Sequence, residues 1–311
     1  GIGFFVDKGN TMNRNERFAS ICLIIAMFIW GSSFVAFKYA LAGYSPLVVI
    51  AARMSVASLI FLVFWKFLAG QQYRKGDWKY LLIMSLCEPC LYFVFEAWAL
   101  VNTTASEAGV VTATLPLLVA ALAALVLKET ISKNHYLGFA ITLPGVIWLT
   151  LAGEASESAP NPALGNFLEF LAMVSAAGYT VALKYVSQRY SAFFLTAIQS
   201  FIGAVFFVPL AFIFEPEMPQ WHSEAAMAVV YLGVVVTMFA YGFYNFAIRH
   251  LSATQTVMFT NLIPVFTLIL AFFILQERIT VQQWFAAGLI IVGVLISQRK
   301  RAVRAPAVEA S

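Results

Sequence analysis

Ten apolar stretches follow one another along this chain of 311 residues, and each is close to the length of a membrane-crossing helix. A helix needs about 20 mostly apolar residues to cross the hydrocarbon core of a bilayer. The stretches are apolar on all sides, whereas the strands of a membrane barrel would alternate apolar and polar residues. We therefore expect an all-α, polytopic membrane protein with ten transmembrane helices. The expected spans are 17–41, 45–68, 77–101, 104–127, 133–152, 163–188, 191–215, 223–248, 252–275 and 281–299.

The small number of charged residues supports the same fold class. Only 11% of the residues are charged and 61% are hydrophobic, whereas a soluble domain carries about 25% charged residues. The surface of this chain must therefore face lipid. Most connections between the spans are too short to hold a separate domain, so we expect the activity to lie inside the membrane, with lipid as the surrounding partner and no nucleic-acid partner.

The basic residues predict the orientation. Lys and Arg in short loops stay on the cytoplasmic side of a membrane. With the N-terminus inside, the cytoplasmic side receives Lys8, Arg14, Arg17, Lys66, Arg74, Lys75, Lys79, Lys128, Lys133, Lys184, Arg189, Arg249, Arg299, Lys300, Arg301 and Arg304, and the outside receives Arg278. We expect a multi-pass protein of the bacterial inner membrane with both termini in the cytoplasm.

Three segments outside the spans complete the expected organisation. Residues 1–16 form a cytoplasmic segment. Residues 1–11 precede Met12, a plausible starting residue, and are interpreted as an artificial extension. Residues 153–162 form a polar outer linker, and 300–311 form a basic cytoplasmic tail. The linker divides the chain into five spans (17–152) and five spans (163–299).

The two halves share a sequence pattern. A shift of 148 residues aligns Thr112 and Pro116 with Thr260 and Pro264, and it also aligns Leu127–Ile131 with Leu275–Ile279 and Gly145 with Gly293. Because each half has an odd number of spans, the halves must cross the membrane in opposite directions. Inverted repeats of this kind are typical of secondary transporters, whose site lies near the midplane between the repeats.

Several of these motifs together resemble a known family. They are Trp30–Phe34 (WGSSF) with Lys38, Arg53 in the second span, the Pro116…Glu129 and Pro264…Glu277 blocks, and the trailing Gly145 and Gly293. Their order is similar to that of the EamA family of the drug/metabolite transporter superfamily, over about Phe18 to Arg299. The resemblance implies a ten-helix basket around a central cavity, export of aromatic and other apolar amino acids, and no cofactor.

The third span holds the strongest candidates for the cavity. A charged side chain in the middle of a bilayer costs at least about 2.5–3.5 kcal/mol on insertion scales. Glu88, Tyr92 and Glu96 are spaced four residues apart and therefore share one helix face. We expect this face to line a wet cavity and Pro89 to kink the helix. Pairing of Glu96 with Lys38 or Arg53 is the alternative, and for Arg53 we favour a structural ion pair.

Further candidates come from both halves. Trp30 and Lys38 lie on one face of the first span, although Lys38 is also placed to reach the outer interface. The remaining expected cavity residues are uncharged hydrogen-bonding groups, namely Thr112, Tyr179, Tyr241, Asn245, Thr260 and Asn261. Pro116 and Pro264 are matched hinge or kink positions. The three His residues are scattered near span ends, so we expect no metal site.

These features predict a transporter and not an enzyme. The main hypothesis is a secondary transporter that exports small apolar or aromatic amino acids, such as phenylalanine, tryptophan, tyrosine, methionine and threonine, by alternating access. A proton-coupled exporter of apolar cations or drugs is the alternative within transport. A channel-like pore and a membrane-embedded enzyme are the alternatives outside it, although Glu88 and Glu96 lie about 12 Å apart along their helix, too far to share a proton. The sequence makes no prediction of the oligomeric state.

Overall fold

The computed structural model describes residues 14–68, 70–127, 133–217 and 219–297, so the expectations for 1–11, Glu129 and 300–311 fall outside it. The α-helices are α1 (Arg14–Leu41), α2 (Pro46–Val63), α3 (Trp78–Ser85), α4 (Tyr92–Asn102), α5 (Ala105–Val111), α6 (Leu115–Leu127), α7 (Lys133–Ala152), α8 (Pro162–Val186), α9 (Ala192–Phe214), α10 (Ser223–Tyr231), α11 (Tyr241–His250), α12 (Ala253–Met258), α13 (Leu262–Leu270) and α14 (Val281–Ser297). Shorter 3-10 and π-helical turns are η1 (Trp65–Phe67), η2 (Leu86–Leu91), η3 (Thr112–Thr114), η4 (Leu232–Ala240), η5 (Phe259–Asn261) and η6 (Ala271–Leu275).

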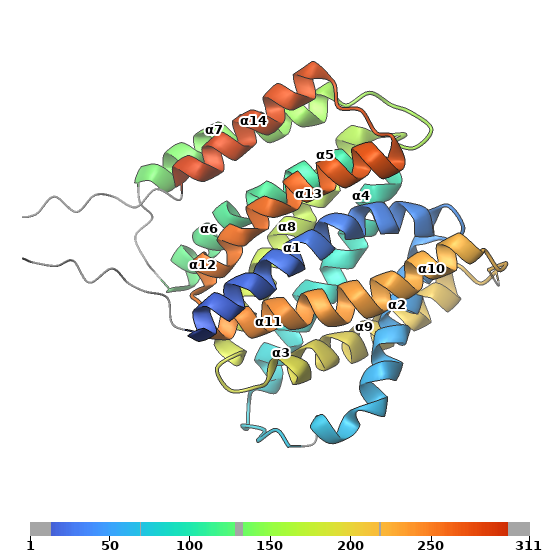
Figure 1. Ribbon diagram of the computed structural model, residues 1–311, viewed down its shortest axis with the longest axis vertical. Coiled ribbons are helices and arrows are strands. Elements are labelled where there is room, and N and C mark those ends of the chain that lie inside the picture. Colours follow the sequence, from blue (N-terminus) through green and yellow to red (C-terminus); the bar gives the residue numbers. More distant parts are fainter. Residues whose placement is uncertain (1–13, 69, 128–132, 218, 298–311) are drawn as a thin grey trace, which may run out of the picture.

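Several segments join end to end, so the described residues form ten helical spans (Figure 1). Eight of them are long and apolar enough to cross a membrane, and Tyr136–Ala152 and Val281–Ser297 are shorter apolar helices. The expected polytopic, all-α fold is therefore confirmed. The boundaries differ in detail, because α1 already includes Arg14 and α2 ends at Val63, five residues before the expected end.

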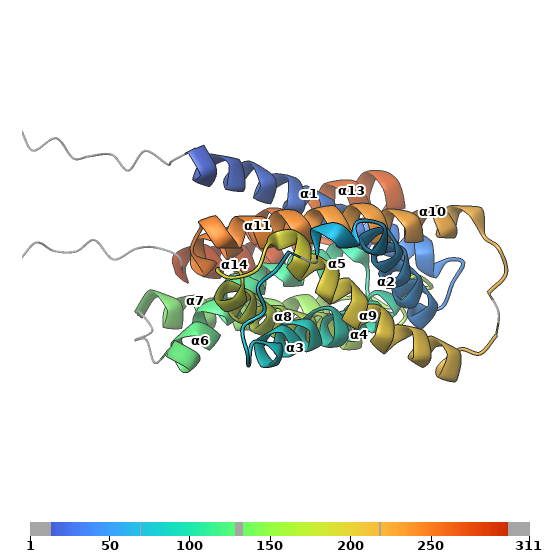
Figure 2. The ribbon, with the colours of Figure 1, turned by 90° about the horizontal axis from the view of Figure 1, so that it is seen from below.

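The spans form two layers that each combine both halves of the chain. In one layer, α1 packs against α10, η4, α11 and α13. In the other, α8 packs against α3, η2, α4 and α6 (Figure 2). The pairs α2–α9 and α7–α14 close the two edges of this basket (Figure 1). The contacts of α1 with the second half thus have counterparts in those of α8 with the first half, as expected for two inverted five-helix repeats.

The two ends of the basket are distinguished below by the segments they carry. The start of α1 and the end of α14 lie at the terminal side, and the loop between α7 and α8, residues 153–161, lies at the linker side (Figure 1). Helix α1 runs from the terminal side to the linker side, whereas α8 begins at the linker side and runs back. The outward faces of the helices carry exposed Phe, Ile, Leu and Val side chains, for example Phe212, Phe214 and Val205. Such a surface is suited to lipid.

The close pairing of α7 with α14 depends on glycine residues at the contact, where a larger side chain would not fit. A Cβ atom added to Gly293 would lie 2.4 Å from the Thr142 hydroxyl oxygen and 2.9 Å from the Gly138 carbonyl oxygen. A Cβ on Gly145 would lie 2.8 Å from Ile290. Small residues permit helix backbones to approach closely in a membrane, where van der Waals packing is a main source of helix association.

Four spans are interrupted at matched places in the two halves. The third span changes direction at Glu88, whose backbone is non-helical (φ −150°, ψ 114°) and which precedes Pro89. The eighth span contains the π-helical turn η4. The 3-10 turns η3 and η5 begin the second part of the fourth and ninth spans, just before Pro116 and Pro264. These interruptions lie beside the central cavity.

Candidate transport site

A narrow cavity lies between the two layers, and the centre of a water-sized sphere can occupy about 40 Å³ of it. Its walls come from both repeats. The lining residues are Trp30, Ser33, Phe34, Arg53, Glu88, Tyr92, Phe93, Glu96, Thr112, Leu115, Met173, Ala176, Tyr179, Thr180, Val236, Tyr241, Tyr244 and Ile263.

One part of the wall carries charged groups. Arg53 of α2 lies with its Nη1 3.9 Å from Oε2 of Glu96 on α4. The Arg53 Nε also donates to the Thr237 hydroxyl at 3.3 Å, and its guanidinium lies 4.1 Å from the centre of the Phe93 ring. Arg53 is only 1% exposed. It is therefore a buried cation held from three sides, and it is oriented toward the cavity.

The two glutamates of the third span each accept a hydrogen bond from a tyrosine. The Tyr92 hydroxyl donates to Oε1 of Glu96 at 2.9 Å. The Tyr241 hydroxyl, on α11 of the other repeat, donates to Glu88. Both carboxyl groups are buried and both line the cavity. Buried charged side chains are costly in a membrane protein, and they usually occur where a functional site needs the charge.

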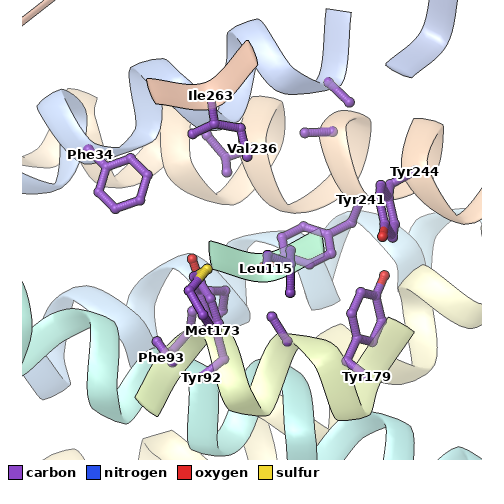
Figure 3. Close-up of a cluster of buried hydrophobic side chains, with 14 of the residues drawn as sticks. Phe34, Tyr92, Phe93, Leu115, Met173, Tyr179, Val236, Tyr241, Tyr244 and Ile263 are labelled. Atoms are coloured by element: carbon purple, nitrogen blue, oxygen red, sulfur yellow. The ribbon is translucent and has the colours of Figure 1, made fainter. Parts of the chain in front are cut away.

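Aromatic rings form another part of the wall, and Figure 3 shows Tyr179, Tyr241 and Tyr244 among them. The ring of Trp30 lies 5.1 Å from that of Tyr241 and 5.0 Å from that of Tyr244. Tyr179 of α8 stacks on Tyr244 with their ring centres 6.1 Å apart. Rings at these distances attract one another and form a rigid apolar surface. The cavity thus has an aromatic wall close to a charged one.

A layer of amides supports the tyrosines from behind. Asn245 accepts a hydrogen bond from the Tyr179 hydroxyl at 2.5 Å and donates to Thr196 and Gln199 at 2.9 and 3.0 Å. Gln199 in turn donates to the backbone carbonyl of Glu88 at 3.0 Å. These bonds connect α8, α9 and α11 to the interrupted third span and fix the position of Glu88.

The structure brings many of the sequence-derived candidates together at this cavity. Those that line it are Trp30, Glu88, Tyr92, Glu96, Thr112, Tyr179 and Tyr241. Asn245 lies one layer behind. The matched hydroxyls of Thr112 and Thr260 each donate to their own helix at 2.6 Å, and Thr260 does not reach the cavity surface.

The remaining candidates lie next to the cavity or away from it. Asn261 ends η5 and is half-buried, and Pro116 and Pro264 are buried in the helices that follow η3 and η5. Pro89 lines a smaller neighbouring pocket with Met54 and Gln199.

Lys38 takes a different position from the one expected of a cavity residue. Its ammonium donates to the Ser158 carbonyl oxygen at 2.7 Å, in the linker. The long side chain reaches the end of the bundle because an ammonium is less costly there than in the core. The expected cavity role of Lys38 has no support in this geometry.

Two buried glutamates were not predicted from the sequence, whereas the ion pair expected for Arg53 is present, with Glu96 as its partner. Glu169 is the eighth of the 25 residues of α8, in the sixth span, and Glu107 lies on α5. Both are buried, at 0% and 3% exposure. The rule that led to Glu88, namely that a charge inside a span needs a reason, applies equally to Glu169 and would have found it. In the described residues no group of three or more His, Cys, Asp or Glu residues is placed to hold a metal ion.

The sequence model of the EamA-like transporter family matches this chain twice, over residues 17–151 and 163–298. The chain belongs to the EamA-like transporter family. The resemblance inferred from the WGSSF segment and the proline and glutamate blocks is thereby confirmed. Members of this family and the named relatives are transporters.

Similar proteins cover almost the whole chain. The uncharacterized transporter YetK of Bacillus subtilis (strain 168) is 26% identical over 306 residues, which are 96% of this chain and 92% of YetK. A probable terminal-alkyne amino-acid exporter of Streptantibioticus cattleyicolor is 24% identical, over 89% of this chain and 92% of the exporter. A crystal structure with 20% identity superposes with a TM-score of 0.65 over 90% of this chain and 96% of that one, which shows the same fold.

Proposed function

We propose that this protein is a secondary transporter that exports small apolar or aromatic amino acids by alternating access across the bacterial inner membrane. In this proposal the terminal side faces the cytoplasm and the linker side faces outward. The observation that carries the proposal is the juxtaposition, in one cavity, of a buried guanidinium, two buried carboxyls and a wall of aromatic rings.

Each part of an amino-acid zwitterion has a complementary group in this cavity. The Arg53 guanidinium is suited to a substrate carboxylate, because arginine presents a planar set of donors that matches carboxylate geometry. Glu88 and Glu96 are suited to the ammonium. Trp30 and Tyr244 offer an apolar aromatic surface to the side chain, with ring centres 5.0 Å apart. A sugar phosphate would need several convergent basic groups, and Arg53 is the one basic residue among the lining residues.

Two further observations support the proposal. The relative from Streptantibioticus cattleyicolor is described as an amino-acid exporter. The inverted repeats also supply matched interruptions on both sides of the cavity. In transporters with such repeats, the cavity opens to either side when the repeats exchange conformations.

Counterflow in liposomes tests the proposal. Purified protein is reconstituted into vesicles that are loaded with unlabelled phenylalanine, and entry of labelled phenylalanine is followed without any ion gradient. We expect competition by methionine, threonine and tryptophan, and none by tetraphenylphosphonium or glucose 6-phosphate. Competition by tetraphenylphosphonium alone would refute the amino-acid assignment.

The acidity of the cavity favours one alternative. Two carboxyls and one guanidinium line it, and an apolar organic cation would complement the carboxyl that lacks a positive partner. The same counterflow experiment distinguishes the two, because phenylalanine counterflow should be abolished in a dedicated cation exporter.

A further inference from the structure

One backbone carbonyl fixes the direction of the hydrogen bonds in the amide layer behind the cavity. The carbonyl oxygen of Glu88 can only accept, so the NH₂ group of Gln199 is the group that lies 3.0 Å from it. The Gln199 oxygen is then turned toward Asn245, whose own NH₂ group donates to it at 3.0 Å. Asn245 is left with its oxygen for the Tyr179 hydroxyl, 2.5 Å away. The hydrogen of the Tyr179 hydroxyl is therefore committed to Asn245.

A second hydrogen bond confirms the orientation of Asn245. The Thr196 hydroxyl donates its hydrogen to the Ala192 carbonyl oxygen at 2.8 Å. It can therefore only accept from Asn245, which donates to it at 2.9 Å. A hydroxyl whose single hydrogen is already used presents only oxygen lone pairs to other groups. Tyr179 is thus a hydrogen-bond acceptor for any molecule that enters the cavity.

This acceptor lies in the aromatic part of the cavity wall. The Tyr179 ring lines the cavity, 6.1 Å from the ring of Tyr244 and 6.3 Å from that of Tyr241. Figure 3 shows Tyr179 and Tyr244 pointing toward one another from α8 and α11. The Tyr244 hydroxyl is hydrogen-bonded to Thr180 at 3.1 Å, and within the described part of the chain no donor reaches the Tyr179 oxygen. Its lone pairs are therefore available to a ligand.

Two other tyrosine hydroxyls also present only lone pairs, but they lie elsewhere on the wall. The Tyr92 hydroxyl donates to Glu96, and the Tyr241 hydroxyl donates to Glu88. Their oxygens therefore lie beside the two carboxyls, in the part of the wall assigned above to the substrate ammonium. Tyr179 donates to an amide instead and lies among the rings, where the substrate side chain is placed.

We propose that Tyr179 is a specificity-determining residue that accepts a hydrogen bond from the substrate side chain, and that Asn245 and Gln199 are the positioning residues that keep it an acceptor. The proposal rests on the function proposed above and names a preferred substrate class. These substrates are aromatic amino acids whose side chain carries a donor, such as the indole N–H of tryptophan or the hydroxyl of tyrosine. Phenylalanine binds in the same place but leaves the Tyr179 oxygen without a donor.

A pair of ligands with the same shape measures this hydrogen bond. Tryptophan and 3-benzothienylalanine differ in that the second carries sulfur in place of the indole N–H. Isothermal titration of detergent-purified wild type should give a roughly 2- to 13-fold higher affinity for tryptophan, the range for one neutral hydrogen bond. Tyr179→Phe keeps the ring and removes the acceptor, so this ratio should fall to about one while phenylalanine affinity stays within about twofold. The exposed control Tyr136→Phe should behave as wild type.

The role of the amides is tested by a reversed preference. In Asn245→Leu the Tyr179 hydrogen has lost its acceptor and can turn toward the cavity, which makes Tyr179 a donor. We expect this variant to lose the preference for tryptophan and to bind 4-pyridylalanine, whose ring nitrogen is an acceptor, better relative to phenylalanine than wild type does. The gain should be absent from the double variant Tyr179→Phe/Asn245→Leu. A common loss of affinity for all these ligands would contradict the positioning role.

The outcomes separate the assignment of Tyr179 from the proposed function. A wild-type ratio of about one for tryptophan and 3-benzothienylalanine would overturn the assignment, because the Tyr179 oxygen would then be satisfied by water in both complexes. Equal weakening of tryptophan, 3-benzothienylalanine and phenylalanine in Tyr179→Phe would also overturn it, since Tyr179 would then bind a group that all three share. If wild type binds none of the three, the amino-acid function itself is refuted.

Discussion

Replacement of Arg53 by methionine tests the assignment of the substrate carboxylate. Methionine fills a similar volume and preserves contact with Phe93, whose ring lies 4.1 Å from the guanidinium. If the substrate carboxylate binds Arg53, the variant loses a charge-assisted hydrogen bond worth about 1.5–3 kcal/mol. That loss corresponds to roughly 10- to 150-fold weaker binding.

The ion pair with Glu96 complicates a simple affinity measurement. Removal of one partner from a buried pair costs about 3–5 kcal/mol when the other remains charged. Glu96 avoids part of this cost by taking up a proton, which weakens its attraction for a substrate ammonium as well. A single dissociation constant for Arg53→Met therefore combines two effects.

A pair of ligands separates these effects. Phenylalanine and phenethylamine share the ring and the ammonium, but only phenylalanine has the carboxylate. We expect wild type to prefer phenylalanine over phenethylamine, and we expect Arg53→Met to lose most of that preference, by roughly the 10- to 150-fold above. Isothermal titration of detergent-purified protein gives both constants, and Arg53→Lys, which preserves the charge but not the planar donor set, should lie between.

The ratio of the two affinities shows whether Arg53 binds the substrate carboxylate directly. If Arg53→Met weakens phenylalanine and phenethylamine by the same factor, Arg53 acts only through Glu96 and does not bind the carboxylate. The complementary comparison uses Glu96→Gln with phenylalanine and 3-phenylpropionate, which lacks the ammonium. An unchanged ratio there would contradict the assignment of the ammonium.

Three further substitutions test the surroundings of the site. Lys38→Gln should leave phenylalanine affinity within about twofold, because its ammonium binds the linker at Ser158; a tenfold loss would return Lys38 to the cavity. Glu277→Gln should destabilise the protein by about 1 kcal/mol, since Glu277 caps the first amides of α5 at 2.8 and 3.0 Å; thermal unfolding in detergent, with Glu224→Gln as control, measures this. Gly293→Leu should separate α7 from α14 and lower the unfolding temperature by several degrees or prevent folding; an unchanged temperature would contradict the close packing.

The fold was predictable because it depends on two simple properties of the sequence. The length of each apolar stretch fixes a spanning helix, since the bilayer leaves the backbone few other ways to satisfy its hydrogen bonds. The matched Thr112–Pro116 and Thr260–Pro264 blocks indicate the repeat. The ends of helices were less predictable. α2 ends at Val63 and η1 follows, although the apolar sequence continues to Leu68.

The residues that line the cavity were predictable only where several of them share one face of a single helix. The four-residue spacing of Glu88, Tyr92 and Glu96 indicated a shared face, and all three line the cavity. The spacing does not say which helices pack against that face. The hydrogen bond between Tyr241 and Glu88 joins residues 153 positions apart, and no local pattern contains it.

The interrupted segments of both repeats contribute residues to the cavity wall. Glu88 lies within η2, Thr112 begins η3, Val236 lies within η4 and Ile263 follows η5 closely, and all four line the cavity. In the proposed function the substrate contacts the spans where their backbone hydrogen bonding is least regular, while the unbroken helices α1 and α8 face them from the opposite layer. Irregular backbone near the midplane is tolerated because it is buried in protein or lines a cavity. Because η2 and η3 are matched by η4 and η5 in the inverted repeat, the proposed alternating access pairs a rearrangement that opens one side with an equivalent one that opens the other.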